Sequence, residues 1–212
     1  MTDLASPPAP GARPSLDELL RLRRDVRRFR SDPLPPDFLQ HLVDAADLAP
    51  SVGLSQPWRI ASVEDPARRA AIRAIFERCN SEALAEQPSS RRAMYARLKL
   101  AGLEQAPCHL AVFSDLDPLQ GGGLGRKTMP EMLEYSTVIA VHTMWLAAQA
   151  MGVGMGWVSI LDPRQVGTVL DAPASWRLIA YLCIGFAVDG SDVPELQRNG
   201  WERRRPSTLH RR

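Results

Sequence analysis

The run Arg23-Arg24-Asp25-Val26-Arg27-Arg28-Phe29 combines side chains that bind anions with one that can move a proton. The planar fork of arginine holds phosphate through two parallel hydrogen bonds. A carboxylate beside the bound anion can act as a general acid or base. The run therefore suggests a phosphate clamp with a carboxylate at its edge. Two other interpretations stay open: a solvated helix end, which explains most charge runs, and a contact with nucleic acid.

Arginine is concentrated at two places in a chain that is otherwise nearly neutral. The 212 residues include 26 basic and 24 acidic side chains, a net charge of +2. Lys99 and Lys127 are the only lysines, and the windows 21–30 and 201–212 hold six and five of the arginines. Genome composition explains the overall excess of arginine. A near-neutral balance argues against nucleic acid. Recognition of a small anion is the functional alternative for the two clusters.

The glycine-rich stretch Gly121–Thr128 looks like a phosphate loop but lacks a residue that such a loop needs. Arg126 stands where a phosphate loop has glycine directly before its lysine. We interpret 121–125 as a loop or lid. The chain has no G-x-G-x-x-G between a strand and a helix and no G-x-S-x-G, which excludes the usual dinucleotide and acyl-hydrolase patterns.

Cysteine and histidine spacing predicts neither a metal site nor a disulfide framework. The proline-rich residues 1–14 look like a disordered leader and not like a secretory signal, so a cytoplasmic protein is expected. The apolar stretch 138–161 is long enough for a membrane span. It holds His142, Gln149 and several glycines without a basic flank, which favours a buried helix of a globular domain and no membrane contact.

The pattern of apolar residues predicts one α+β domain over 15–212 with an extended polar C-terminal tail. A capping box at Ser15 begins the first helix, and a second helix runs from Phe38 to about Ala49. Further helices are expected at 66–86, 91–104, 131–151 and 163–171, and strands at 58–64, 108–114, 154–161 and 177–188. Because helices and strands do not alternate strictly, a doubly wound sheet is disfavoured.

Four segments in this order resemble the flavin-dependent nitroreductase family. Arg23–Phe29 and Ala49–Trp58 match the family patterns R-R-S-x-R-x-F and A-P-S-x-x-N-x-Q-P-W, with Asp25 in place of serine and Leu54 in place of asparagine. Gly152–Leu161 matches the glycine-rich strand beside the flavin, with Ser159 where a glutamate is common. Trp201–Pro206 matches a C-terminal W-x-x-R-x-P.

The resemblance implies a nitroreductase-like fold: a central mixed, mainly antiparallel sheet flanked by helices, in an intertwined homodimer with FMN sites at the subunit interface. In such a dimer the apolar helix 131–151 forms core and interface. The departures Asp25 and Ser159, with the runs Ala96–Gly102 and Gly125–Glu131, resemble one branch of the family.

Members of that branch consume reduced FMN and dioxygen and release 5,6-dimethylbenzimidazole, the lower ligand of cobalamin (vitamin B12), and erythrose 4-phosphate. The implied partners are reduced FMN, dioxygen and a separate flavin reductase, with no direct binding of NAD(P)H. The alternative within the family is an NAD(P)H-dependent FMN nitroreductase or flavin oxidoreductase. A third interpretation is a non-catalytic FMN-binding or basic interaction module.

The resemblance also assigns roles to individual residues. Asp25 is the expected general acid or base, kept ionised by any arginine that faces it. Ser159 is expected over the reactive edge of the ring. Stretch 88–104 either covers the ring or packs in the core. Arg203, Arg204 and Arg205 are the C-terminal candidates for binding the FMN phosphate. The expected flavin contacts are Arg23, Arg24, Asp25, Val26, Arg27, Pro50, Ser51, Leu54, Met94, Leu98, Trp157, Val158, Ser159 and Arg204.

Overall fold

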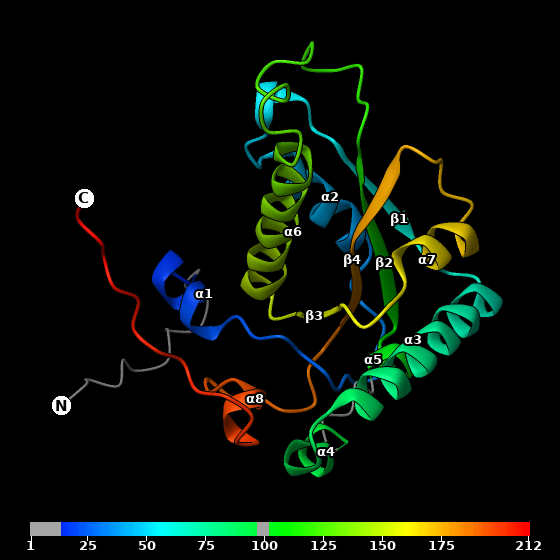
Figure 1. Cartoon of the computed structure of the whole chain (residues 1–212), viewed down its shortest axis with the longest axis vertical. Helices are drawn as coiled ribbons and strands as arrows, with labels where there is room; N and C mark the ends of the chain where they lie inside the picture. Colours follow the sequence, from blue (N-terminus) through cyan, green and yellow to red (C-terminus); the bar gives the residue numbers. More distant parts are fainter. Residues whose placement is uncertain (1–13, 97–101) are drawn as a thin grey trace.

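The computed structural model describes residues 14–96 and 102–212 (Figure 1). The predicted leader lies, apart from residue 14, outside the described residues. The helices are α1 (Leu16–Leu22), α2 (Phe38–Asp47), the 3-10 turn η1 (Val52–Leu54), α3 (Pro66–Glu86), α4 (Ser89–Tyr95), α5 (Gly102–Gln105), α6 (Met132–Ala150), α7 (Pro163–Val169) and α8 (Glu195–Arg198). The strands are β1 (Trp58–Ser62), β2 (Cys108–Asp115), β3 (Gly154–Val158) and β4 (Trp176–Gly185).

The four strands form one sheet in the order β1-β2-β4-β3, and each neighbouring pair is antiparallel. The register places Ile60 opposite Val112, and Leu110 opposite Leu182. Figure 1 shows helices on both faces of this sheet, with α2 and α6 on one side and α3 and α7 on the other. The predicted α+β class, with a mainly antiparallel sheet flanked by helices, is confirmed.

Each face of the sheet covers its own apolar core. On the α6 side, Phe38, Leu42, Met144 and Leu182 are among the buried residues. On the α3 side, Ile72, Phe113 and Tyr181 belong to a second cluster. Alternate residues of β4 therefore supply both cores, since successive side chains of a strand point to opposite faces.

Helix α6 is apolar on nearly all sides, but only one side of it is covered within the chain. Ala140, Val141 and Met144 are fully buried against the sheet, whereas Val138 and Ile139 are about 40% exposed. Along residues 14–96 and 102–212, the structure contains no helix whose length and apolar character would let it cross a bilayer.

Several predicted boundaries are confirmed, and others change. The Ser15 amide donates to Glu18 Oε2 at 2.7 Å, which completes the capping box at α1. The predicted strand 154–161 ends already at Val158, because Asp162 and Pro163 begin α7 three residues after Ser159. The predicted helix 91–104 is found as α4 and α5, with 97–101 outside the described residues. Helix α8 was not predicted in the polar tail.

Candidate functional site

The arginine run does not continue helix α1 but lies extended beside the sheet. Helix α1 ends at Leu22, and Asp25 forms a parallel bridge with Met155 of β3. The Val26 amide donates to Met155 O at 3.1 Å, and Phe29 bridges to Ala187 after β4. The solvated helix end is therefore excluded. The sheet fixes the backbone of this segment, which gives its side chains defined directions.

Glycines in β3 make this close approach possible. A Cβ atom at Gly156 would lie 2.1 Å from the carbonyl oxygen of Val26. At Gly154 it would lie 2.8 Å from Cγ2 of the same valine. The glycine-rich character of β3 thus has a packing reason, since a side chain would push the arginine run away from the strand.

Asp25 is held by the strand end and by one arginine. Its Oδ1 accepts a hydrogen bond of 2.9 Å from the Trp157 amide, and its Oδ2 lies 3.4 Å from Arg27 Nε. Burial nevertheless raises the pKa of Asp25, because it outweighs the lowering by the amide, Arg27 and Arg23. The pKa shift of Asp25 is thus opposite in direction to the one expected from the neighbouring arginines alone. A carboxyl group with a raised pKa is suited to exchange a proton closer to neutral pH.

Arginines from both ends of the chain gather in one pocket beside Asp25. Arg204 lies there, whereas Arg203 and Arg205 do not line it. Of the three C-terminal arginines expected to bind a phosphate, Arg204 is thus the one that the fold brings to this pocket. The lining residues are Arg23, Arg24, Asp25, Arg27, Pro194, Glu195, Leu196 and Arg204.

The positive charge of this pocket is only partly neutralised. Burial and the nearby Arg204 lower the pKa of Arg23 and of Arg24. The buried Nε of Arg24 has no hydrogen-bond partner among the described residues. The Arg23 guanidinium lies 4.7 Å above the Trp145 ring, which fixes it by a cation–π contact. An unpaired buried donor and clustered guanidinium groups fit a phosphate dianion.

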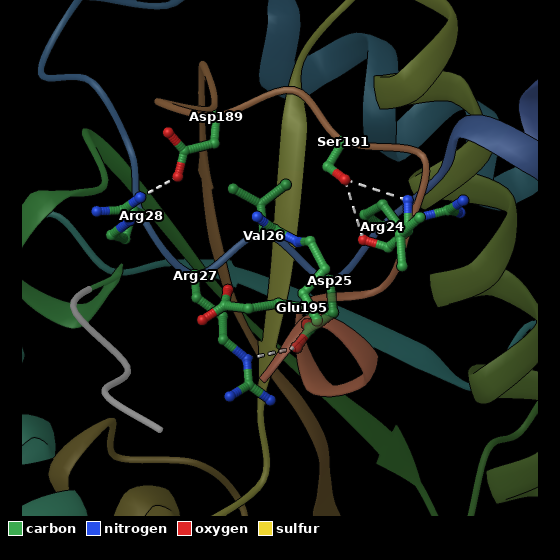
Figure 2. Close-up of a pocket in the computed structure, with 10 residues that line it drawn as sticks. Arg24, Asp25, Val26, Arg27, Arg28, Asp189, Ser191 and Glu195 are labelled. Carbon is green, nitrogen blue, oxygen red and sulfur yellow. Dashed lines mark hydrogen bonds and ion pairs between the residues drawn. The ribbon is translucent and has the colours of Figure 1, made fainter. Parts of the chain in front are cut away.

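A second, smaller pocket also borders Asp25 (Figure 2). Figure 2 shows Arg28 directed to Asp189, with which it forms an ion pair, and Arg27 directed to Asp25. Glu195 lines this pocket as well as the arginine pocket. Sequence reasoning missed Glu195, because it stands in a polar tail where no spacing distinguishes it from a solvated residue.

The other residues expected near the ring have diverse environments. Ser159 is exposed and follows the end of β3, two residues beyond the amide that binds Asp25. Val158 is buried in the α3-side core, so only its backbone is available to a ligand. Trp157 packs against Trp145 with ring centroids 6.4 Å apart. Met94 is half-buried on α4, and Leu98 lies outside the described residues.

The segment with Pro50, Ser51 and Leu54 does not reach the arginine pocket of its own chain. The Val52 amide donates to Ser136 Oγ in the first half of α6, whereas Trp145 Nε1, later on α6, donates to Arg24 O. These two anchors are about 14 Å apart along the helix axis at 1.5 Å per residue. Figure 1 likewise shows η1 at one end of α6 and β3 at the other. Within one chain, the residues expected to contact the flavin therefore lie at two separate places.

The glycine-rich loop packs on the segment around Leu54. Gln120 Nε2 donates to Leu54 O at 2.7 Å, and a Cβ atom at Gly121 would lie 2.9 Å from Gly53 O. Leu54 has a positive φ of 55° and is 69% exposed. The loop thus supports a strained, outward-facing leucine and does not cover the arginine pocket of its own chain.

Comparison with known proteins gives consistent matches. The nitroreductase family model matches residues 20–186. A 5,6-dimethylbenzimidazole synthase of Rhodospirillum rubrum is 54% identical over 203 residues, which cover 96% of this chain and 96% of that protein. A second one, from Rhodobacter capsulatus, is 46% identical over 200 residues, which cover 94% of this chain and 97% of that protein.

A solved structure of another protein has a similar fold. The crystal structure of oxidised iodotyrosine deiodinase bound to FMN and 3-iodo-L-tyrosine is 25% identical. The match covers 93% of this chain and 98% of that chain, with a TM-score of 0.74. The chain therefore belongs to the nitroreductase family, where 5,6-dimethylbenzimidazole synthases are among its relatives.

Proposed function

We propose that the protein converts reduced FMN and dioxygen into 5,6-dimethylbenzimidazole and erythrose 4-phosphate, and so provides the lower ligand of cobalamin. The observation that carries this proposal is Asp25, a half-buried carboxyl group at the edge of an arginine pocket, where nitroreductases commonly have serine. The similarity to two curated 5,6-dimethylbenzimidazole synthases over nearly the whole chain supports it. Reduced FMN, when bound, supplies the electrons for dioxygen and the atoms of the product.

In this proposal the arginine pocket binds the phosphate of FMN. Arg23, Arg27 and Arg204 provide guanidinium groups from both ends of the chain, and the unpaired Nε of Arg24 is a further donor. Fixing the phosphate places the ribityl chain beside Asp25, because the same pocket includes this carboxyl group. Binding energy from the phosphate then orients the part of the ligand where bonds break.

Asp25 holds or moves the proton in this proposal. The Trp157 amide and Arg27 fix the direction of its carboxyl group, and burial keeps its pKa raised. Ser159, two residues further along the chain from Trp157, presents its hydroxyl group at the ring edge. A neutral hydroxyl group at this place leaves room for dioxygen without an added charge.

The site is completed by a second copy of the chain. Pro50, Ser51 and Leu54 lie at the far end of α6 from the arginine pocket, so the residues assigned to the flavin cannot all meet within one chain. The uncovered residues Val138 and Ile139 of α6 provide an apolar surface for a homodimer. In this arrangement Leu54 of one copy faces the ring bound by the other.

One assay tests the function. Anaerobically reduced FMN is added to the purified protein, air is admitted, and the products are analysed by mass spectrometry. We expect 5,6-dimethylbenzimidazole in amounts comparable to the protein or above. Reoxidation to FMN without benzimidazole would refute the proposal, and NAD(P)H consumption with a nitroaromatic substrate would favour the nitroreductase alternative. Absence of flavin binding would leave the non-catalytic interaction module.

Mixed dimers test the shared site. Asp25→Asn and Leu54→Arg each affect a different half-site, so each variant alone is expected to be inactive. Refolding the two together at equal amounts restores one intact site in each heterodimer, or about a quarter of the wild-type activity. If heterodimers form but stay inactive, the half-sites do not combine across the dimer.

A further inference from the structure

The position of Arg204 needs an explanation, because the surrounding segment has no regular structure. Residues 202–212 are exposed and form neither helix nor strand. Arg204 nevertheless lines the pocket with Arg23, Arg24 and Arg27. Arg23 and Arg24 repel Arg204, and this repulsion adds to the burial that lowers the pKa of both. The carboxylates of Asp25 and Glu195 line the same pocket and offset part of this repulsion. An otherwise free tail would still lose its place by conformational entropy, so a contact outside the pocket is needed to restrain Arg204.

Trp201 provides that contact. It is half-buried, in contrast to the residues that follow it. Its ring meets the Tyr95 ring edge-on, with centroids 6.1 Å apart, and the Arg91 guanidinium lies 5.5 Å above it. Both partners belong to α4. The Trp201 amide also donates to Leu196 O at 2.8 Å, which ties the tail to α8.

Helix α4 is in turn attached to the body of the domain. Tyr95 Oη donates to Asn80 Oδ1 of α3 at 3.1 Å. Figure 1 shows α8 and α4 near each other at the end of the molecule where the C-terminal tail departs. Arg204 follows Trp201 by three residues, a reach of about 10 Å in an extended chain. The ring contact therefore limits where the Arg204 guanidinium can go.

We infer that Trp201 is a positioning residue: clamped by Arg91 and Tyr95 of α4, it holds Arg204 in the arginine pocket for the phosphate of the ligand. The inference rests on the proposed function, in which FMN occupies that pocket. Without the clamp, the ligand must order residues 202–204 at its own cost, so affinity falls. The clamp also links the phosphate to α4, the helix that carries Met94.

Loss of Trp201 is therefore expected to weaken the binding of flavins that carry a phosphate and to leave the binding of other flavins nearly unchanged. Trp201→Ala should weaken the binding of FMN roughly 10- to 100-fold, the effect of losing a charge-assisted hydrogen bond. Riboflavin has the same ring and no phosphate, so its affinity should change less than about twofold. Arg204→Ala should give the same pattern. Titration calorimetry with oxidised FMN and with riboflavin measures both affinities.

A double variant separates positioning from a general structural effect. If Trp201 acts through Arg204, Trp201→Ala with Arg204→Ala should bind FMN no more weakly than Arg204→Ala alone. Arg205→Ala is the matched control, since Arg205 does not line the pocket, and its FMN affinity should be unchanged. Trp201→Phe keeps a ring against α4 and should retain most of the affinity.

Two outcomes overturn the inference. One is an equal loss of FMN and riboflavin affinity in Trp201→Ala, which indicates general loosening of the site. The other is additive losses in the double variant. Should Trp201→Ala fail to fold, the exposed Arg91→Ala removes the cation–π contact alone and should show a smaller loss with the same preference for FMN. If the wild type binds FMN and riboflavin equally well, the phosphate pocket of the proposed function is itself refuted.

Discussion

Asp25 and Trp157 are 132 residues apart in the chain, yet the Asp25 carboxylate accepts a hydrogen bond of 2.9 Å from the Trp157 amide. This contact joins the arginine run to the end of strand β3. It gives one oxygen of the carboxyl group a fixed position, and Arg27 holds the other. The contact therefore sets both the direction of Asp25 and its distance from Ser159.

Replacing Asp25 with asparagine should separate binding from chemistry. The carboxamide oxygen of the new side chain can still accept from the Trp157 amide, so we expect FMN affinity to stay within about threefold of wild type. Formation of benzimidazole should fall at least about 100-fold, the usual contribution of a general acid or base. Asp32→Asn, which affects an exposed ion pair with Arg30, is the control. Full product formation by Asp25→Asn would disprove the catalytic role.

Ser159→Ala should change the fate of reduced FMN more than its binding. If the hydroxyl group positions dioxygen at the ring edge, its removal lets reduced FMN reoxidise without cleavage. We expect the ratio of benzimidazole to reoxidised FMN to fall at least about tenfold. Ser81→Ala, on the exposed side of α3, should leave the ratio unchanged. An unchanged ratio in Ser159→Ala would restrict the role of this residue to its backbone.

Gly156→Ala tests the packing of the arginine run on β3. The new Cβ atom would lie 2.1 Å from the Val26 carbonyl oxygen, which cannot rotate away. We expect a loss of about 1–3 kcal/mol in the free energy of unfolding and weaker FMN binding, because Asp25 moves with Val26. In Gly167→Ala the nearest atom is 4.0 Å away, so stability and binding should be retained. Urea unfolding measures the difference, and wild-type behaviour of Gly156→Ala would contradict the close contact.

The stability of the fold should decrease in mildly acidic solution because of His109. Burial lowers the pKa of His109 from 6.5 to about 4. The contribution of the neutral, buried His109 to the free energy of unfolding is fully present above pH 6.5. It is lost as the pH falls to 4, because the unfolded chain then binds a proton that the folded chain does not. The free energy of unfolding should decrease by about 3 kcal/mol over this range.

Two histidine variants identify the source of this pH dependence. His109→Asn keeps a polar atom toward Tyr181, whose Oη lies 2.9 Å from His109 Nδ1, and should flatten the dependence. His41→Asn, exposed on α2, should keep the wild-type slope. Urea unfolding at several pH values measures both, and an unchanged slope in His109→Asn would exclude His109 as the cause.

Local patterns in the sequence were enough to predict the elements and most of the chemical groups. The capping box at Ser15, the α3 boundaries 66–86 and the apolar character of α6 each depend on neighbouring residues, so they could be predicted without the fold. The arginine run was recognisable for the same reason, since its residues are contiguous in the chain. The glycine spacing of β3 was visible too, although its reason was not.

The tertiary structure decided which of these groups lie close together and how their pKa values shift. The fold placed Arg204 and not its neighbours beside Arg23, and it separated Leu54 from that pocket by about 14 Å along α6. It also reversed the expected pKa direction of Asp25. The sequence shows which charges are neighbours in the chain, whereas burial and contacts between distant segments depend on the packing of the whole domain. At Asp25, desolvation by that packing raises the pKa more than the neighbouring charges lower it.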